Sequence, residues 1–368
     1  MSQGPVRAAI IGTGRIASRL EKDPLRSKPH THAGWYAAHP RVTLVAGADT
    51  DPAALAEFSA DWAVPASHCY ADYREMLARE RPDVVSVCAY APERVEMCEA
   101  AIAAGARGLW IEKAVACSLE EAARLEAALA RAGVAAVVDQ PRRADPRYRA
   151  VQRLVAGQQF GRLETVHALF SGHFLHTGVH AWDVLRFWCG PWRSVTAWLE
   201  TPDLGPADGR DRRVGLAGTP EQPAEAGEVV DRGGHALVTF ASGARAFVSG
   251  CRKRFFVFQF DLLFEGGRVQ LGNDGWLAWA PAPSPRYTGF VELAPQSAEQ
   301  VLDADDPAPR GMLDDLLHAL DTGEPPLMSV RHAVAALELG LAAFQSDAMG
   351  HREVLPGEVS PTRRVVSR

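Results

Sequence analysis

The first residues whose types and spacing indicate a chemical function are two glycines and an alanine. They form the pattern G-x-G-x-x-A from Gly12 to Ala17, directly after the apolar run Val6–Ile11. Such glycines allow a tight turn and a close approach of the backbone to a pyrophosphate, and a helix starting there offers unpaired N–H groups to the phosphates. A glycine-rich turn without a ligand is the alternative. The expected dinucleotide contacts are Gly12, Thr13, Gly14, Arg15 and Ile16.

An acidic residue, Asp49, ends the second apolar run, where the ribose hydroxyl groups of a dinucleotide are expected. A carboxylate at this place accepts a hydrogen bond from the 2′-hydroxyl group and repels a 2′-phosphate, so it favours NAD over NADP as cofactor. Asp51 competes for the same role, and Asp49 could instead cap the turn that follows it.

The distance in sequence between the glycines and Asp49 is longer than the usual ~20 residues. An inserted loop over Ser18–Thr31, which contains two prolines and many charges, would account for the excess. His30 and His32 stand at its end, and each could cap a helix or face the active site; helix capping is the favoured interpretation.

The elements that must position these residues follow from hydrophobic spacing. Short apolar runs alternate with Ala-, Glu-, Leu- and Arg-rich stretches whose apolar residues recur at helical spacing. This predicts an α/β domain with a doubly wound parallel sheet, whose apolar strands are buried on both faces. The expected strands are Val6–Ile11, Val42–Ala48, Asp83–Ala89, Gly108–Ile111 and Val134–Val138, and the expected helices are Pro52–Trp62, Tyr73–Glu80, Glu93–Ala104 and Leu119–Ala132.

Beyond about Pro141, consecutive β-rich segments predict a second domain of the α+β type with a large, mostly antiparallel open sheet. We therefore expect a Rossmann domain over residues 1–140 and a substrate-binding domain over residues 141–368. Residues 203–233, rich in Gly, Pro and charge, are expected to form a surface loop. The expected elements here are the helices Pro146–Val155, Gly172–Trp188 and Arg331–Asp347, and the strands Leu163–Phe170, Ala236–Phe240, Ala244–Ser249, Phe255–Phe264 and Val269–Leu271.

At the end of the run Trp110–Lys113 the sequence resembles the glucose–fructose oxidoreductase/inositol dehydrogenase/MocA family. That family has Glu-Lys-Pro here, with a proline that favours a cis peptide bond, whereas this chain has Ala114 after the Glu-Lys pair. Tyr90-Ala91 stands where the family usually has Thr-Pro beneath the cofactor, and Val95 stands in place of its usual His.

A second segment, Leu175–Asp183, resembles the helix that lines the substrate cleft in that family. Gly178, His180 and Asp183 match its pattern, and His176 stands at the position of its first Asp. Together with Val151–Arg162, which resembles the family's passage from helix to sheet, the likeness covers nearly the whole chain.

The resemblance implies roles for the matching residues. Lys113 would lie near the nicotinamide ribose and the reacting hydroxyl group, His180 would transfer the proton, and Glu112 would hold the cofactor or Lys113. Tyr90 would lie against the cofactor. These roles are chemically reasonable, because a neutral His, with a pKa of about 6.5, can accept a hydroxyl proton, a step worth about 10²–10⁴-fold. A lysine cation stabilises the developing alkoxide.

His176 is the main departure from the family's pattern. In a regular helix His176 and His180 would lie one turn apart on one face, where they could share a proton or bind a metal together with His173 or Asp183. The absence of a metal is the favoured expectation. The residues expected to contact substrate are Asp183, His173 and Arg142, the last through an anionic group.

Composition restricts the possible partners. The formal net charge of -6 and the pI of about 6.1 disfavour a nucleic-acid partner. No run approaches the ~20 apolar residues of a membrane span, no secretory signal precedes the first strand, and the six cysteines form no C-x-x-C pair. A cytoplasmic enzyme is therefore expected, and the resemblance implies a homodimer or homotetramer that assembles through the C-terminal sheet.

Three functions remain open from the sequence. The first is an NAD(P)-dependent oxidoreductase that transfers a hydride between nicotinamide and a secondary alcohol or ketone of a sugar, a cyclic polyol or a derivative. The second is a sugar-modifying enzyme, such as a glycosidase or an epimerase, that uses tightly held NAD transiently. The third is a non-catalytic dinucleotide sensor.

Overall fold

The structure, a computed structural model, describes residues 4–200, 229–251, 255–273, 275–297 and 311–366. By internal contacts the chain divides into two compact units, Met1–Pro141 with Pro309–Val334, and Arg142–Ala308 with Ala335–Arg368. The segment that contains helix α9 (Met312–Thr322) thus belongs to the first unit. The domain boundary expected from the sequence, between residues 140 and 141, assigns this segment to the second domain instead.

The first unit contains a six-stranded parallel sheet with the strand order β3-β2-β1-β4-β5-β6. The order reverses direction between β1 and β4, which is the place where doubly wound sheets bind ligands at the carboxyl ends of their strands. The strands are β1 (Val6–Ile11), β2 (Val42–Ala48), β3 (Cys69–Tyr70), β4 (Val84–Val87), β5 (Gly108–Ile111) and β6 (Ala135–Val138). The predicted parallel Rossmann-type sheet is confirmed.

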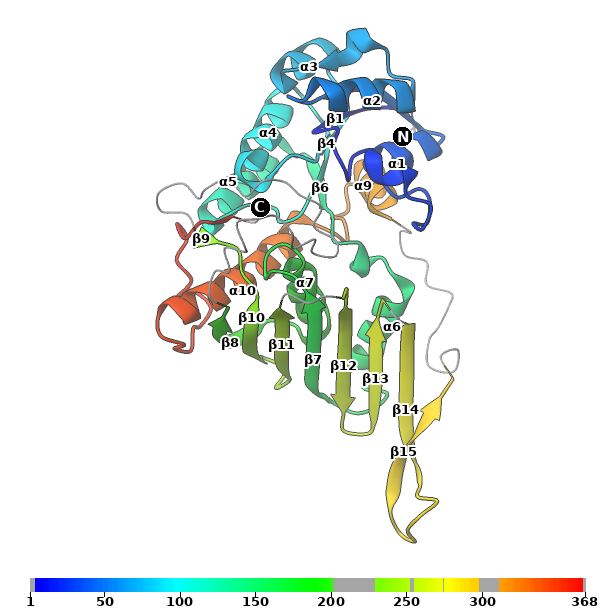
Figure 1. The fold of residues 1–368 in the computed structure, drawn as a ribbon, viewed down its shortest axis with the longest axis vertical. Coiled ribbons are helices and arrows are strands. Elements are labelled where there is room, and N and C mark those ends of the chain that lie inside the picture. The colour runs from blue at the N-terminus through cyan, green and yellow to red at the C-terminus, as the bar shows by residue number, and fades with distance from the viewer. Residues whose placement is uncertain (1–3, 201–228, 252–254, 274, 298–310, 367–368) are drawn as a thin grey trace. The chain divides into compact units, whose positions relative to one another are not determined.

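Several helices of this unit begin at a side chain that caps them. Asp51, Asp72 and Ser118 accept a hydrogen bond from the first turn of the helix that follows each of them, and Gly133 ends one helix with a φ of 65°. Around the sheet lie α1 (His32–Ala38), α2 (Pro52–Trp62), α3 (Tyr73–Glu80), α4 (Ala91–Ala103), α5 (Leu119–Ala132) and α9 (Figure 1).

The predicted insertion after the glycine motif is visible as an interruption of a helix. The N–H groups of His32 and Ala33, at the start of α1, donate to the carbonyl oxygens of Ile16 and Ala17. In an uninterrupted α-helix, each N–H donates to the carbonyl oxygen four residues before it. Here Ile16 and Ala17 provide these carbonyl oxygens for His32 and Ala33. Most of residues 18–31 are therefore looped out of one helical path, and they include a short 3₁₀ helix, Arg19–Lys22. The insertion explains the long separation between Gly14 and Asp49.

The second unit contains an eight-stranded sheet with the order β15-β14-β13-β12-β7-β11-β10-β8, in which only the β7–β11 pair is parallel. The predicted mostly antiparallel sheet is confirmed. Its strands are β7 (Leu163–Ser171), β8 (Trp192–Leu199), β10 (Gly234–Phe240), β11 (Arg245–Cys251), β12 (Phe258–Phe264), β13 (Gly267–Gly272), β14 (Gly275–Pro283) and β15 (Val291–Gln296).

One face of this sheet packs against α6 (Pro146–Ala156), α7 (Gly178–Cys189) and α10 (Val330–Ala348). Burial alternates along β7, where Val166, Ala168 and Phe170 are buried between exposed neighbours. Such alternation is typical of a sheet that packs on one face only. The core beneath the helices is aromatic: Trp188 contacts Tyr148 and Phe260 through rings 5.6 and 5.1 Å apart.

Two sequence predictions for this unit were wrong. The helix expected over Gly172–Trp188 begins only at Gly178, because the N–H groups of Phe174, Leu175 and His176 donate to the Arg232 carbonyl and the Asp231 carboxylate instead of to a preceding helical turn. The loop expected over residues 203–233 ends in a strand, β9 (Val229–Val230), which pairs with β16 (Val365–Val366) near the end of the chain. The rest of that loop, up to residue 228, lies outside the described residues.

The part of the chain that the structure describes contains neither a membrane-spanning helix nor a disulfide bond. No helix there is both long and apolar enough to span a membrane. The described cysteine side chains form no disulfide bond with one another.

Candidate dinucleotide site and catalytic residues

The turn after β1 is built around Gly12. Its φ of 85° favours glycine, and a Cβ atom added there would lie 2.9 Å from the backbone nitrogen of Ala89. Gly12 therefore lets the turn pack closely against the end of β4. At Gly14 the situation is the opposite, because an added Cβ would meet no heavy atom of the protein within 4 Å. The backbone at Gly14 is open to the approach of a ligand.

The turn also presents unused hydrogen-bond donors. The backbone N–H groups of residues 14–17 donate to no acceptor among the described residues, although a regular α-helix does not start here. Successive N–H groups of this kind form an anion-binding concavity, and the small Ala17 is fully buried beneath it. The donors and the open Gly14 backbone fit a pyrophosphate.

Asp49 fastens the glycine turn to the end of β2. One carboxylate oxygen accepts hydrogen bonds from the Thr13 N–H at 2.7 Å and from the Thr13 hydroxyl group at 3.3 Å, and the other accepts the Asp51 N–H at 2.9 Å. Asp51 itself caps α2 through the Ala53 N–H. Of the two predicted ribose ligands, Asp49 is thus the one that contacts the glycine turn.

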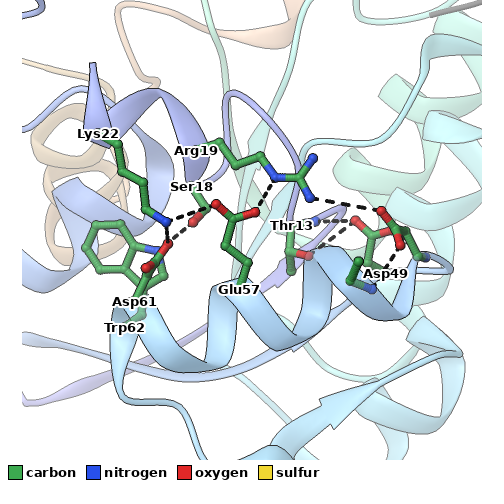
Figure 2. A network of polar contacts seen from close by, with 10 residues as sticks. Thr13, Ser18, Arg19, Lys22, Asp49, Glu57, Asp61 and Trp62 are labelled. Atoms are coloured by element: carbon green, nitrogen blue, oxygen red, sulfur yellow. Dashed lines mark hydrogen bonds and ion pairs between the residues drawn. The ribbon is translucent and has the colours of Figure 1, made fainter. Parts of the chain in front are cut away.

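The inserted segment is anchored to α2 by a polar network (Figure 2). Arg19 Nε donates to Glu57 at 2.6 Å, Lys22 Nζ lies 2.9 Å from Glu57 and 2.7 Å from Asp61, and the Trp62 indole donates to Ser18 Oγ at 2.7 Å. These ion pairs lie at the surface, where such pairs contribute little stability. Their effect is to fix where the insertion leaves the helical path.

Glu112 and Lys113 lie at the carboxyl end of β5. The Glu112 carboxylate is almost completely buried, and one of its oxygens accepts the backbone N–H of Lys113 at 3.2 Å. The Lys113–Ala114 peptide bond is cis. Burial acts to raise the pKa of Glu112, but hydrogen bonds to His32 and Asp139, together with the charge of Lys113, outweigh it and hold that pKa below its usual range. These interactions favour the ionised form of Glu112.

His32 is a residue that the sequence interpretation placed wrongly. Thr31 caps α1, and the His32 side chain instead lies fully buried, with Nε2 3.3 Å from Glu112 Oε1 and Nδ1 2.9 Å from Ser86 Oγ. The available signal was Ser86, because a polar residue inside an apolar strand requires a buried hydrogen-bond partner.

Arg94 is a second residue that the sequence interpretation missed. It lies on α4 beside Val95, and its buried guanidinium donates to the carbonyl oxygens of Ala89, at 2.6 Å, and of Ala114. Arg94 thus joins the loops that follow β4 and β5. Burial lowers its pKa from the ordinary value. Tyr90 is the N-cap residue of the same helix. It is 61% exposed, and its side chain forms no capping hydrogen bond.

Gln140 follows β6 and is level with Lys113, since Ile111 and Val138 are paired in the parallel register. Its side chain is 1% exposed, and neither its amide nitrogen nor its amide oxygen has a hydrogen-bond partner within the described part of the chain. A buried amide in this state is destabilising by about 1–3 kcal/mol for each unpaired group.

In the second unit the predicted histidines occupy different elements. His180 is in the first turn of α7, whereas His176 is on the turn before the helix. The two are therefore not one helical turn apart, as the sequence interpretation assumed. The backbone N–H of His176 donates to the buried carboxylate of Asp231 at 2.7 Å, and the carbonyl of His173 accepts the Thr177 and Gly178 N–H groups.

Asp183 lies in the interior of the second unit. Its two carboxylate oxygens lie 2.7 and 2.9 Å from Nε of Arg143, and both side chains are at most 4% exposed. Burial raises the pKa of Asp183 to about 6, although the Arg143 guanidinium acts to lower it. The Asp183 carboxylate is thus paired inside the unit, and its predicted contact with substrate stays a prediction. Arg142, by contrast, stacks on Phe258 at 3.8 Å.

The first unit thus gathers the glycine turn, Asp49, Tyr90, Glu112 and Lys113 at the carboxyl edge of its parallel sheet. The second unit carries Arg142, His173, His176 and His180. The fold and the glycine turn of the first unit define a dinucleotide-binding domain of the Rossmann type.

Comparison with known proteins identifies the family of that domain. Residues 6–140 match the model of the glucose–fructose oxidoreductase/inositol dehydrogenase/MocA family, described as an oxidoreductase family with an NAD-binding Rossmann fold. The predicted resemblance and the NAD-binding Rossmann fold are therefore confirmed over residues 6–140.

One curated relative is a 1-carboxy-3-chloro-3,4-dihydroxycyclohexa-1,5-diene dehydrogenase from Comamonas testosteroni. It is 31% identical over 137 residues, which are 37% of this chain and 34% of the relative. The chain therefore matches about a third of the length of this dehydrogenase.

Solved structures share the fold of nearly the whole chain. The WlbA dehydrogenase from Bordetella pertussis, in complex with NADH and UDP-GlcNAcA, is 20% identical with a TM-score of 0.70 over 95% of this chain and 98% of that one. The aldose-aldose oxidoreductase from Caulobacter crescentus, complexed with glycerol, is 19% identical with a TM-score of 0.72 over 95% and 99%. An oxidoreductase from Agrobacterium radiobacter with NAD+, L-tartaric acid and magnesium is 17% identical with a TM-score of 0.69 over 96% and 98%.

Proposed function

We propose that this protein is an NAD-dependent oxidoreductase that transfers a hydride between nicotinamide and a secondary alcohol or ketone of a sugar, a cyclic polyol or a derivative. The observation that carries the proposal is the edge of the first unit, where unused N–H donors, an open Gly14 and the Asp49 carboxylate lie on the sheet that also presents Lys113. The UDP-GlcNAcA bound to one structural relative, and the name of another, an aldose-aldose oxidoreductase, support the substrate class.

In this proposal the N–H groups of residues 14–17 hold the pyrophosphate, and Asp49 holds the adenosine ribose. NAD, when bound, supplies the hydride acceptor. The Lys113 cation stabilises the alkoxide as the substrate hydroxyl group loses its proton, and His180 accepts that proton. Glu112 and Arg94 fix the backbone on either side of Lys113.

The experiment is a screen of purified protein for NAD+- and NADP+-linked turnover over sugars, inositols and sugar acids, followed by absorbance of the reduced nucleotide. The variant K113M should lower kcat by about 10²–10⁴-fold, and H180N by a similar factor. Lys28, on the insertion, offers the matched control K28M, which should retain activity. Full activity in both K113M and H180N would refute these roles.

The substitution of His for an acid at position 176 favours a second candidate, a sugar-modifying enzyme that uses tightly held NAD transiently. A simple observation distinguishes the net oxidoreductase from this second candidate. The transient use of NAD requires that purified protein retain the nucleotide and convert sugar with no net change in NADH absorbance. Stoichiometric formation of NADH would exclude it.

We further propose that the uncovered face of the eight-stranded sheet binds a second copy of the chain. This face carries large apolar side chains that are 36–56% exposed, namely Leu169, Trp198, Phe247, Leu263 and Leu277. His167, Leu169, Phe247 and Trp198 line a shallow groove of about 380 Å³ there. Exposed apolar patches of this kind mark interfaces. Light scattering of the wild type should give the mass of a dimer or tetramer, and F247D should lower the number of subunits in the oligomer. A monomeric wild type would refute the proposal.

A further inference from the structure

A buried chain of polar side chains joins the inserted segment to the strand end that carries Lys113. The Tyr36 hydroxyl oxygen lies 2.6 Å from Ser86 Oγ, and Ser86 Oγ lies 2.9 Å from Nδ1 of His32. His32 Nε2 in turn lies 3.3 Å from Glu112 Oε1. All four residues belong to the first unit and are nearly inaccessible to solvent. A polar chain this deeply buried has a cost unless every member is paired.

The following arrangement of protons satisfies every member of this chain. An ionised carboxylate only accepts hydrogen bonds, so the Nε2–H of His32 donates to Glu112. With the imidazole proton on Nε2, Nδ1 accepts the Ser86 hydroxyl proton, and Ser86 accepts the Tyr36 hydroxyl proton. The His32 ring lies 3.9 Å from the Trp110 ring, centroid to centroid, which holds the imidazole in this orientation.

The same carboxylate connects His32 to the lysine. Glu112 Oε1 is held by His32, and Glu112 Oε2 accepts the backbone N–H of Lys113. We propose that His32 is a positioning residue for Lys113, because it fixes the carboxylate that in turn fixes the backbone from which the lysine side chain departs. The proposal rests on the proposed function of Lys113. It makes the α1 end of the insertion part of the framework of the active site.

The proposal predicts a pH effect as well as a loss of rate. Glu112 faces His32 from α1, Asp139 after β6 and Lys113 beside it, and Cys88 and Arg94 act on it from the β4 end and α4. Without the His32 donor, one of the interactions that keeps Glu112 ionised is lost. Glu112 would then take up a proton at a higher pH, so the acid limb of the rate profile should move to higher pH.

The test compares H32F, which fills the site but cannot donate, with H32Q, whose amide can donate to Glu112 and accept from Ser86. The reaction is that of NAD+ with the best alcohol of the screen. H32F should lower kcat by about 10- to 100-fold and leave the KM for NAD+ unchanged. It should also move the acid limb of the pH–rate profile to higher pH. H32Q should stay within a few-fold of wild type. H318F, at a half-exposed histidine paired with Glu324, is the matched control and should have no effect.

Two further measurements cover failure of H32F to fold and failure of the proposed function. S86A removes the proton donor to Nδ1, allows the other tautomer and should lower kcat in the same direction. Long-range ¹H–¹⁵N spectra of wild type should show His32 as the neutral Nε2–H tautomer, a result that needs no substrate. Wild-type kcat in H32F or S86A, equal damage in H32Q and H32F, or an Nδ1–H tautomer would overturn the proposal. Full activity of K113M would instead overturn the proposed function.

Discussion

The substitution D49N should change the preference between the two nucleotides. A carboxylate offers about four acceptor sites, and the contacts to Thr13 and Asp51 use three of them. One remains for the 2′-hydroxyl group of NAD. A hydrogen bond to a charged group is worth about 1.5–3 kcal/mol and a neutral one about 0.5–1.5 kcal/mol. The neutral amide should therefore weaken NADH binding by about 1 kcal/mol, or roughly 5- to 10-fold.

The same substitution should strengthen NADPH binding. A carboxylate and a doubly charged phosphate about 5 Å apart repel each other by about 2 kcal/mol even at the dielectric constant of water. With that repulsion removed, the ratio of NADH to NADPH affinity should fall by on the order of 100-fold.

The assay is fluorescence titration of NADH and NADPH into wild type, D49N and the matched control D51N. Asp51 is more than half exposed, and an amide there keeps the capping bond to the Ala53 N–H. D51N should retain the wild-type ratio. An unchanged ratio in D49N, or the expected change in D51N instead, would refute the assignment of the ribose to Asp49.

Three further predictions concern buried polar groups. D183A should lower the free energy of unfolding by about 3–5 kcal/mol in urea titrations because it leaves Arg143 unpaired, and R143M/D183L should recover most of that loss; equal stability of D183A and wild type would contradict it. Q140L should be neutral or should raise that free energy by about 1 kcal/mol, because it removes unpaired buried groups, whereas a clear loss would show that the amide is paired. The lowered pKa of Glu112 contributes stability above about pH 4.5 that is lost as the pH falls, so the difference in stability between wild type and E112Q should shrink between about pH 5 and about pH 3; a constant difference would argue against an ionised Glu112.

The parallel sheet could be predicted from the sequence because its strands are short, apolar and separated by well-capped helices. β1, β2 and β5 and the helices α2, α3 and α5 have the predicted bounds. The insertion could be inferred from one number, the separation of Asp49 from the glycines. The position of α9 in the first unit could not, since it depends on contacts between segments far apart in the chain.

The side-chain partners of the site were harder to predict than its location. Arg142 and Arg143 are adjacent in sequence, and it is Arg143 whose Nε pairs with the buried carboxylate of Asp183, whereas Arg142 stacks on Phe258. His176 was assigned to a helix because its neighbours have helical spacing, whereas local hydrogen bonds and the Asp231 carboxylate hold it in a turn. Asp231 itself fell within a segment predicted to be a loop. Such pairings are set by tertiary packing, which residue spacing alone does not determine.

The central claim is that the glycine turn of the first unit holds a pyridine dinucleotide. Calorimetry of NAD+ and NADH with wild type and G14V tests it most directly, because a Cβ atom at Gly14 meets no protein atom within 4 Å yet would obstruct the approach of a pyrophosphate. The account predicts that wild type binds at least one of the two, and that G14V unfolds at the wild-type temperature with at least about a tenfold loss of affinity. A folded wild type that binds neither nucleotide, or a G14V variant that binds as tightly, would contradict it.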